Sequence, residues 1–96
     1  DEWTKGKAGY KLLQYMSMAI PPVVSPVGFN REIVKDGVNG FLADTDEEWV
    51  EKISLLIEDK NLREKIGKNA RATIENNYSL IKASDKLFKI FEKSLR

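Results

Sequence analysis

A glycine- and lysine-rich segment near the start of the sequence has the residue types that bind phosphate. It runs from Gly6 to Lys11 and leads into a stretch with helical spacing of its apolar residues. Glycines at a helix N-terminus let backbone amides approach an anion, and the helix dipole favours negative charge there. Lys7 and Lys11 are four residues apart, so both side chains can lie on one face of the helix. The pattern is compatible with a phosphate or diphosphate site, and equally with a solvated start of a helix.

Two further polar residues have positions at which ligands bind. Gln14 lies two turns along the same helix, where its amide can hydrogen-bond a hydroxyl of a ligand held at the helix start. A solvated or packed glutamine is the alternative interpretation. Glu32 follows a loop at the carboxyl end of a predicted strand, the edge at which α/β proteins bind ligands. Compensation of a helix dipole explains this glutamate equally well.

The composition excludes several kinds of chemistry. The sequence contains neither cysteine nor histidine, which excludes disulfides, thiol nucleophiles, Ser–His dyads and zinc sites built on Cys or His. Sixteen Lys and Arg against fifteen Asp and Glu leave a net charge of +1, without the basic surplus of nucleic-acid-binding proteins. Catalysis would therefore depend on carboxylates, lysines, tyrosines, backbone amides or the substrate itself.

Residues 1–43 are predicted to form the α/β part of the chain. Apolar spacing predicts a helix over Lys7–Met18, which two prolines then end. Val23–Ser25 is predicted as a strand buried on both faces, and Gly40–Ala43 as a second strand. We expect these strands to pair in parallel, because short crossover connections are right-handed and parallel. Between them, Asn30 is predicted to cap a turn of helix over residues 31–34.

Residues 44–96 are predicted to be an all-helical tail of three helices. Thr45 and Glu48 have capping-box spacing, Asp59 is expected to cap the second helix, and Ser79 the third. Asn76-Asn77 is predicted to end the second helix in the left-handed conformation. The residues expected to face inward are Trp49, Val50, Ile53, Leu56, Ile57, Leu62, Ile66, Ala70, Ile74, Ile81, Ser84, Leu87, Phe88, Phe91 and Leu95.

The alternation of helices and strands indicates an α/β layer protein, yet two strands are too few for a stable sheet. At 96 residues the chain is a single unit, so we expect it to be the end of a larger Rossmann-like domain, or its sheet to be completed by a second copy. No apolar run is long enough to span a membrane, which predicts a cytosolic or peripheral protein. The lysines of the last predicted helix offer an alternative contact with anionic lipid.

Most of the chain resembles the C-terminal domain of the group 1 glycosyltransferases, which are retaining GT-B enzymes of glycosyltransferase family 4. The resemblance begins in the two stretches Lys11–Ser25 and Arg31–Leu42. It continues, with order and spacing preserved, through Asp46–Ile53, Leu62–Arg71 and Tyr78-Ser79.

The resemblance implies that residues 1–96 are a C-terminal fragment of the nucleotide-sugar-binding domain of a cytoplasmic hexosyltransferase of polysaccharide biosynthesis. Such an enzyme transfers a sugar from a nucleotide-diphosphate donor to an acceptor and needs no metal or other cofactor. The fragment is expected to be inactive alone and to require the missing N-terminal part of the enzyme or a second copy. Its location would be the cytoplasm, with peripheral contact at the inner membrane face as an alternative.

The resemblance also assigns roles to individual residues. The family's two glutamates, eight positions apart, correspond here to Gly6 and Gln14, which places these residues at the donor sugar and ribose. The family glycine that brings amides up to the diphosphate corresponds to Gly9, and the amide of Tyr10 follows it. Lys7, Gly9, Tyr10 and Lys11 are therefore expected to bind the donor diphosphate. The competing interpretation is a non-enzymatic α/β interaction module whose helical tail packs on a partner.

Overall fold

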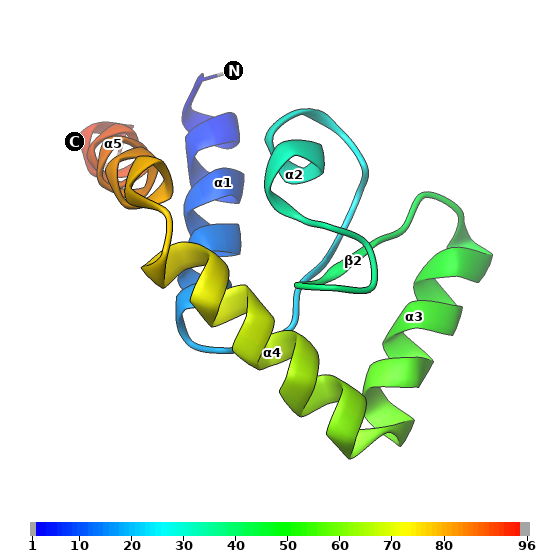
Figure 1. The fold of residues 1–96 in the computed structure, drawn as a ribbon. Helices are drawn as coiled ribbons and strands as arrows, with labels where there is room; N and C mark the ends of the chain where they lie inside the picture. The colour runs from blue at the N-terminus through cyan, green and yellow to red at the C-terminus, as the bar shows by residue number, and fades with distance from the viewer. Residues whose placement is uncertain (1, 95–96) are drawn as a thin grey trace.

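The computed structural model describes the backbone of residues 2–94, and the side chains of residues 9–94 except residues 78, 83, 84, 91 and 94. Five helices and two very short strands follow one another along this part of the chain (Figure 1). In order they are α1 (Glu2–Ser17), β1 (Val23–Val24), α2 (Gly28–Ile33), β2 (Phe41–Leu42), α3 (Asp46–Glu58), α4 (Lys60–Glu75) and α5 (Tyr78–Ser94). No helix in the described range is long and apolar enough to cross a membrane.

The two strands pair in parallel, as the sequence predicts. Val23 lies opposite Phe41, and Val24 lies opposite Leu42. The Phe41 amide donates to the Pro22 carbonyl at 2.8 Å, and the Ala43 amide donates to the Val24 carbonyl at 2.9 Å. The predicted fold class is thereby confirmed as mixed α/β, with short parallel strands and a helical C-terminal part. The strands are less buried than expected, since both residues of β1 are half-exposed.

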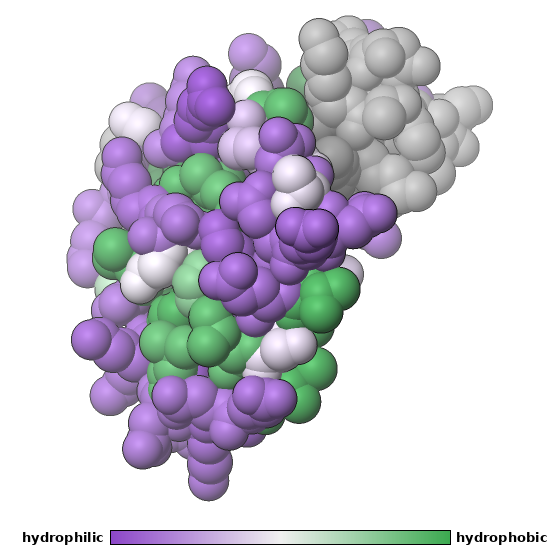
Figure 2. Space-filling model, turned by 90° about the vertical axis from the view of Figure 1, so that its right-hand side faces the viewer, coloured by the Kyte–Doolittle hydropathy of each residue, from purple (hydrophilic) through white to green (hydrophobic). Residues whose placement is uncertain are grey.

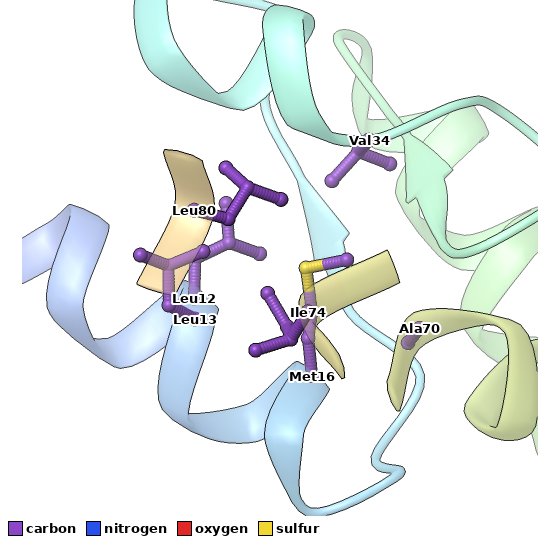
Figure 3. Close-up of a cluster of buried hydrophobic side chains, with 7 residues drawn as sticks. All are labelled: Leu12, Leu13, Met16, Val34, Ala70, Ile74 and Leu80. Atoms are coloured by element: carbon purple, nitrogen blue, oxygen red, sulfur yellow. The ribbon is translucent and has the colours of Figure 1, made fainter. Parts of the chain in front are cut away.

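The main core lies where α1 meets α4 and α5. The buried side chains come from α1, the end of α2, α4 and α5, and Figure 3 shows them converging. Met16 is fully buried and Leu13 is 1% exposed, so α1 contributes two of the least exposed side chains of this cluster. The members are Leu12, Leu13, Met16, Val34, Ala70, Ile74 and Leu80. α1 is therefore positioned mainly by the helical tail.

A second, smaller cluster joins the strands to α3 and α4. Phe41, Leu56 and Ile66 are its buried members, and Val23 and Leu62 pack against them. The predicted stripe on α4 is confirmed by Ile66, Ala70 and Ile74. On α3, however, only Leu56 is buried. Val50, Ile53 and Ile57, which were expected to face inward, are 67%, 42% and 69% exposed.

The start of α1 differs from the prediction. The helix begins at Glu2, five residues before Lys7, so Gly6 and Gly9 lie inside it. Glycine at position 9 has a packing explanation, because a Cβ there would lie 2.9 Å from Cδ1 of Leu87. Gly9 thus allows α5 to approach α1 closely, and the sequence alone carries no signal of that contact.

Helix α1 ends in a left-handed residue that is not glycine. Ala19 has φ 60°, and among the described residues it is the only non-glycine with positive φ. The amide of Ile20 donates to the Tyr15 carbonyl at 3.0 Å, and that of Ala19 to the Met16 carbonyl at 3.1 Å. These bonds form a Schellman motif. The turn presents the Ala19 carbonyl to α4 at Gly67, where a Cβ would lie 2.2 Å from that oxygen.

Two of the predicted helix caps are confirmed. The hydroxyl of Thr45 accepts from the Glu48 amide at 3.1 Å, and the Glu48 carboxylate accepts in return from the Thr45 amide at 3.1 Å. Asp59 accepts from the Leu62 amide at 3.0 Å. Both caps depend only on residues three apart in sequence, which is why the pattern alone identifies them.

The other predicted caps are wrong. Asn30 lies inside α2 and its side chain donates to the Ser25 carbonyl at 3.2 Å. The cap at the start of α5 comes from Asn77, which accepts from the Leu80 amide at 3.2 Å, and not from Ser79. Asn76, which ends α4, has φ −96° and is not left-handed. A tight turn of two asparagines leaves several possible cap positions, and packing selects among them.

The inward face of α5 is also corrected. Leu80 is buried and Leu87 packs against the core, whereas Ile81 and Phe88 are 42% and 43% exposed. The predictions for Ser84, Phe91 and Leu95 fall outside the described side chains. The helix is thus rotated relative to the predicted face, which places Leu80 against α1.

We predict that substitutions at the contact between Ala19 and Gly67 change stability in opposite directions. Gly67→Ala should destabilise by about 2 kcal/mol, because overpacking against the Ala19 carbonyl outweighs the usual gain of about 1 kcal/mol for this change in a helix. Ala19→Gly should stabilise by about 0.5–1 kcal/mol by relieving a left-handed alanine. Urea denaturation measures both free energies of unfolding.

The neighbouring exposed residue Lys68 provides the control for this pair. Lys68→Ala removes an exposed side chain of α4 one position away and should alter stability by less than about 0.5 kcal/mol. A Gly67→Ala protein as stable as the parent would contradict the described contact.

Candidate functional site

A groove of about 490 Å³ runs along β1, between α1 and α3. Its wall is mainly apolar, with three polar residues contributed by α1, the end of β1 and α2. The lining residues are Lys11, Leu12, Tyr15, Ile20, Pro21, Pro22, Val23, Val24, Ser25, Asn30 and Trp49. An apolar groove with a few polar groups is typical of ligand sites and of surfaces that receive another chain segment.

The polar residues of the groove gather near the carboxyl end of β1. Ser25 follows the last strand residue, and Asn30 is tied to the Ser25 carbonyl through its side-chain amide. Lys11 reaches the same groove from α1. Ligands of α/β sheets bind at the carboxyl ends of the strands. Of the residues predicted to bind the donor, Lys11 lines the same groove as Ser25 and Asn30, and its role as a ligand stays a prediction.

Lys11 and Gln14 share one face of α1. Both are exposed and three positions apart, so their side chains can act on the same ligand. The opposite side of the helix is occupied by the buried residues Leu13 and Met16. The packing of α1 thus leaves Lys11 and Gln14 directed away from the core.

The remaining predicted site residues have a different setting from the one expected. Gly9 and Tyr10 were expected to bind the diphosphate through free backbone amides at the start of a helix. Both residues instead lie inside α1, where backbone amides bond to carbonyls of the preceding turn. Gly9 is buried, and the Tyr10 ring lies 5.5 Å from the ring of Phe88. The backbone of Gly6 and Lys7 is helical, while the side chain of Lys7 lies outside the described part. Their ligand roles stay predictions.

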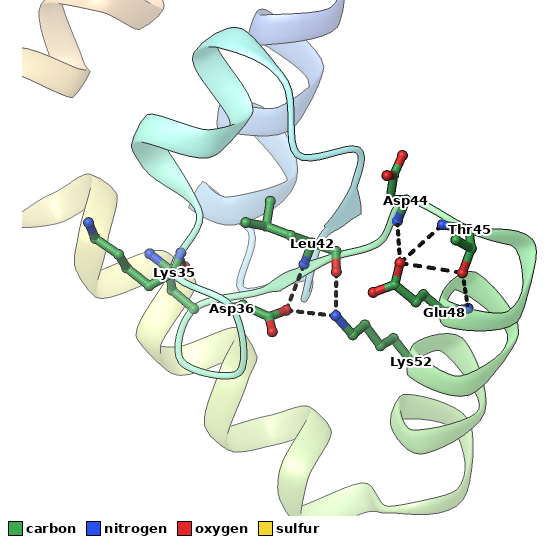
Figure 4. Close-up of polar contacts among 8 residues, drawn as sticks. Lys35, Asp36, Leu42, Asp44, Thr45, Glu48 and Lys52 are labelled. Carbon is green, nitrogen blue, oxygen red and sulfur yellow. Dashed lines mark hydrogen bonds and ion pairs between the residues drawn. The ribbon is translucent and has the colours of Figure 1, made fainter.

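The structure reveals an ion pair that holds β2 to α3. Oδ1 of Asp36 accepts from the Leu42 amide at 2.8 Å and from Lys52 Nζ at 3.1 Å (Figure 4). Lys52 Nζ also donates to the Leu42 carbonyl. Burial raises the pKa of Asp36, but the bonds from Leu42 and Lys52 outweigh it and leave the pKa below 3.8. The sequence did not indicate this contact, because its partners are sixteen residues apart.

Asn39 anchors the turn before β2 to α4. The residue is 4% exposed, and its Oδ1 accepts from the Lys35 amide at 2.7 Å. Its Nδ2 donates to the Ile33 carbonyl at 3.1 Å and to Oγ1 of Thr73 at 3.0 Å. Asn39-Gly40 therefore does more than form a turn, since it fixes the chain between α2 and β2 against the helical tail.

The described side chains include no group of three or more His, Cys, Asp or Glu that could hold a metal ion. Two acidic residues, Asp36 and Glu48, are instead engaged in structural bonds. Glu48 is an example, because hydrogen bonds from the amides of Thr45 and then Asp44 hold its pKa below 4.5. The prediction that the reaction needs no metal stays a prediction.

Comparison with known proteins gives the family. The family model described as "Glycosyl transferases group 1" matches residues 4–73, which reach from α1 almost to the end of α4. The chain belongs to this family. The match includes the groove, the exposed face of α1 and the turn at Ala19. It confirms the resemblance found in the sequence.

This group 1 family member is similar to two curated proteins. Spore coat protein SA of Bacillus subtilis is 27% identical over 82 residues, covering 82% of this chain and 22% of the relative. An uncharacterized glycosyltransferase of Methanocaldococcus jannaschii is 38% identical over 90 residues, covering 92% of this chain and 23% of the relative. The chain thus spans less than a quarter of the length of these curated relatives. No solved structure matches it significantly.

We predict that the bond between Asp36 and Lys52 weakens in acid. The pKa of Asp36 is lower in the folded state than its usual 3.8. The stabilisation of the folded state by the ionised carboxylate is therefore complete above that value and is lost as the pH falls through the folded pKa. The stability difference between the parent and Asp36→Asn should therefore shrink below about pH 4. Urea denaturation between about pH 3 and pH 7 measures this difference in the free energy of unfolding. Asp85→Asn, on α5, is the control. A difference that does not depend on pH would contradict the assignment.

Proposed function

We propose that the intact protein is a retaining glycosyltransferase that transfers a sugar, of hexosyl type, from a nucleotide-diphosphate donor to an acceptor. Residues 1–96 would supply part of the donor site and be inactive alone. One observation carries the proposal: in a chain of this family, Lys11 and Gln14 are exposed on one face of α1, and Lys11 lines the same groove as Ser25, which follows β1. Cationic and amide groups beside such a groove suit a nucleotide.

In the proposed reaction the bond between the anomeric carbon and the donor diphosphate breaks, and the nucleoside diphosphate leaves with the electron pair. The acceptor hydroxyl oxygen forms the new bond to carbon, and its proton passes to the leaving diphosphate. Negative charge develops on the leaving phosphate, and a fixed cation stabilises it more than it stabilises the bound donor. Lys11 is the described residue suited to this role, and Lys7 lies one turn earlier on the helix. Gln14 would hold the ribose hydroxyls, and no metal or other cofactor is required.

The proposal gives residues 1–96 the position of a C-terminal fragment of the nucleotide-sugar-binding domain. The acceptor site and the rest of the donor site would come from other parts of the intact protein, or from a second copy. Its proposed location is the cytoplasm. The four lysines Lys82, Lys86, Lys89 and Lys93 are exposed on α5, which supports peripheral contact with an anionic membrane as the alternative.

A non-enzymatic interaction module is the second candidate, favoured by the exposed apolar side chains of α3. Val50, Ile53 and Ile57 are all more than one third exposed, Val50 and Ile57 by about two thirds. Figure 2, which views the molecule from the α3 side, shows hydrophobic residues exposed among hydrophilic ones. Nucleotide binding separates the two candidates, because an interaction module has no need of it.

We predict that Lys11→Ala weakens binding of the donor diphosphate to the intact enzyme. A charge-assisted hydrogen bond to phosphate contributes about 1.5–3 kcal/mol, so the dissociation constant should rise by at least about tenfold. Lys11 is exposed, and its loss should change stability little. Lys65→Ala removes the same charge from α4 and is the control for titration calorimetry. Equal donor affinity in both variants would show that Lys11 is a solvated surface residue that does not contact the donor.

We predict a second, graded effect at Gln14. Gln14→Leu should cost about 1–3 kcal/mol of donor affinity by leaving ribose hydroxyls without partners. Gln14→Glu should bind as tightly as the parent or more tightly, because a carboxylate accepts two hydroxyl bonds and Lys11 offsets its charge. Titration at fixed salt measures all three proteins. A leucine variant with parental affinity would place the ribose contact elsewhere.

A further inference from the structure

The turn before β2 contains a dipeptide that is prone to spontaneous deamidation. Asn39 is the only asparagine of the sequence that is followed by glycine. Glycine has no side chain to hinder attack by its own amide nitrogen, so this dipeptide is more reactive than other asparagine sequences. The Gly40 nitrogen bonds to Cγ of Asn39, and the side-chain amide leaves as ammonia with the proton of the attacking nitrogen. Water then opens the resulting succinimide ring to aspartate or isoaspartate.

The fold requires both residues of this reactive dipeptide. A Cβ at Gly40 would lie 2.7 Å from Cγ of Pro22 and 2.9 Å from the Pro22 carbonyl oxygen, so a larger residue does not fit beside the entry to β1. Asn39 accepts one buried hydrogen bond and donates two others. An amide is the side-chain group that offers an acceptor and two donors on so short a stem. Replacing either residue would therefore cost contacts of the folded state.

The same contacts protect Asn39 in the folded protein. The residue is 4% exposed, which limits access of the hydroxide that removes the Gly40 amide proton and of the water that opens the ring. Nδ2 is the atom that would leave as ammonia, and it donates to the Ile33 carbonyl at 3.1 Å and to Thr73 Oγ1 at 3.0 Å. Ring closure breaks both bonds. Deamidation is thus confined to molecules in which the turn has opened.

The product does not fit the site that Asn39 leaves. An aspartate would place a carboxylate oxygen where Nδ2 now donates. The Ile33 carbonyl has no proton to offer this oxygen, and the Thr73 hydroxyl already donates to the Asn69 carbonyl at 2.9 Å. A buried carboxylate that faces acceptors is strongly destabilised. Isoaspartate would in addition lengthen the backbone between α2 and β2 by one atom.

We propose that Asn39 is a modification site that deamidates when the turn before β2 opens, and that the modified chain no longer folds into this turn. Opening of the turn is reversible in itself, but the chemical step makes it permanent. The proportion of modified Asn39 is then a record of how long the chain has spent unfolded. The proposal rests on the turn alone and does not depend on nucleotide binding.

Mass spectrometry of the full-length protein tests where deamidation occurs. The tryptic peptide of residues 36–52 contains Asn39 and no other asparagine or glutamine, so a gain in mass from amide to acid is assigned to that residue. Asp36-Gly37 can form the same ring, but its hydrolysis leaves the mass unchanged. In mildly alkaline buffer the modified fraction should grow at least about tenfold faster with urea than without it. Equal rates would overturn the proposal, and so would an absence of product in urea.

Refolding tests the fate of the product. After dilution from urea, protease-resistant molecules should carry modified Asn39 at least about tenfold less often than the digested ones. Asn39→Asp should also fail to regain resistance, whereas Asn61→Asp, the same change at an exposed residue of α4, should refold like the parent. Equal modification of both fractions, or equal refolding of both variants, would overturn the proposal. No nucleotide is needed, so its failure leaves the proposed function intact.

Discussion

The burial of one face of α1 against α4 and α5 is the constraint on which the rest of the structure depends. Leu13 and Met16 are almost completely removed from solvent, and burial of side chains of this size stabilises by about 1.5–3 kcal/mol each. Because a helix has fixed angular spacing, burying these residues determines where every other side chain of α1 points. Lys11 and Gln14 are thereby directed outward. The proposed donor contacts are thus a consequence of hydrophobic packing in the tail.

The connection from this helix to the strands is tightly specified. A left-handed Ala19 turns the chain toward β1, and its carbonyl lies against the helix α4 at Gly67. The same turn leads through two prolines into the strand that carries the groove. On the other side, Asp36, Asn39 and Lys52 fix β2 against α3 and α4. The groove therefore lies between elements whose positions are set by backbone contacts and by polar side-chain bonds.

The sequence predicts the features that depend on neighbouring residues. The capping box of Thr45 and Glu48, the cap at Asp59 and the parallel strands were all found, because spacing, proline positions and crossover handedness decide them. It does not predict features that depend on distant residues. Gly9 was expected in the first turn of a helix, as part of an anion site, whereas the approach of Leu87 from α5 accounts for a glycine well inside the helix.

The same limit applies to the candidate site. Lys11 and Gln14 could be placed on one helical face from their spacing alone, and the structure places both on the surface. The helix start at Lys7 could not be placed correctly, because glycines favour both helix ends and close helix packing. The ion pair between Asp36 and Lys52 joins the turn before β2 to α3, so no local sequence pattern indicates it.

We propose that α1 presents a nucleotide-binding face beside the groove along β1. A crystal structure of the intact protein with a nucleoside diphosphate is the decisive test. We expect a phosphate oxygen within hydrogen-bonding distance of Lys11 Nζ, about 2.7–2.9 Å, and the ribose beside Gln14. A nucleotide bound elsewhere, with Lys11 and Gln14 both in solvent, would contradict it.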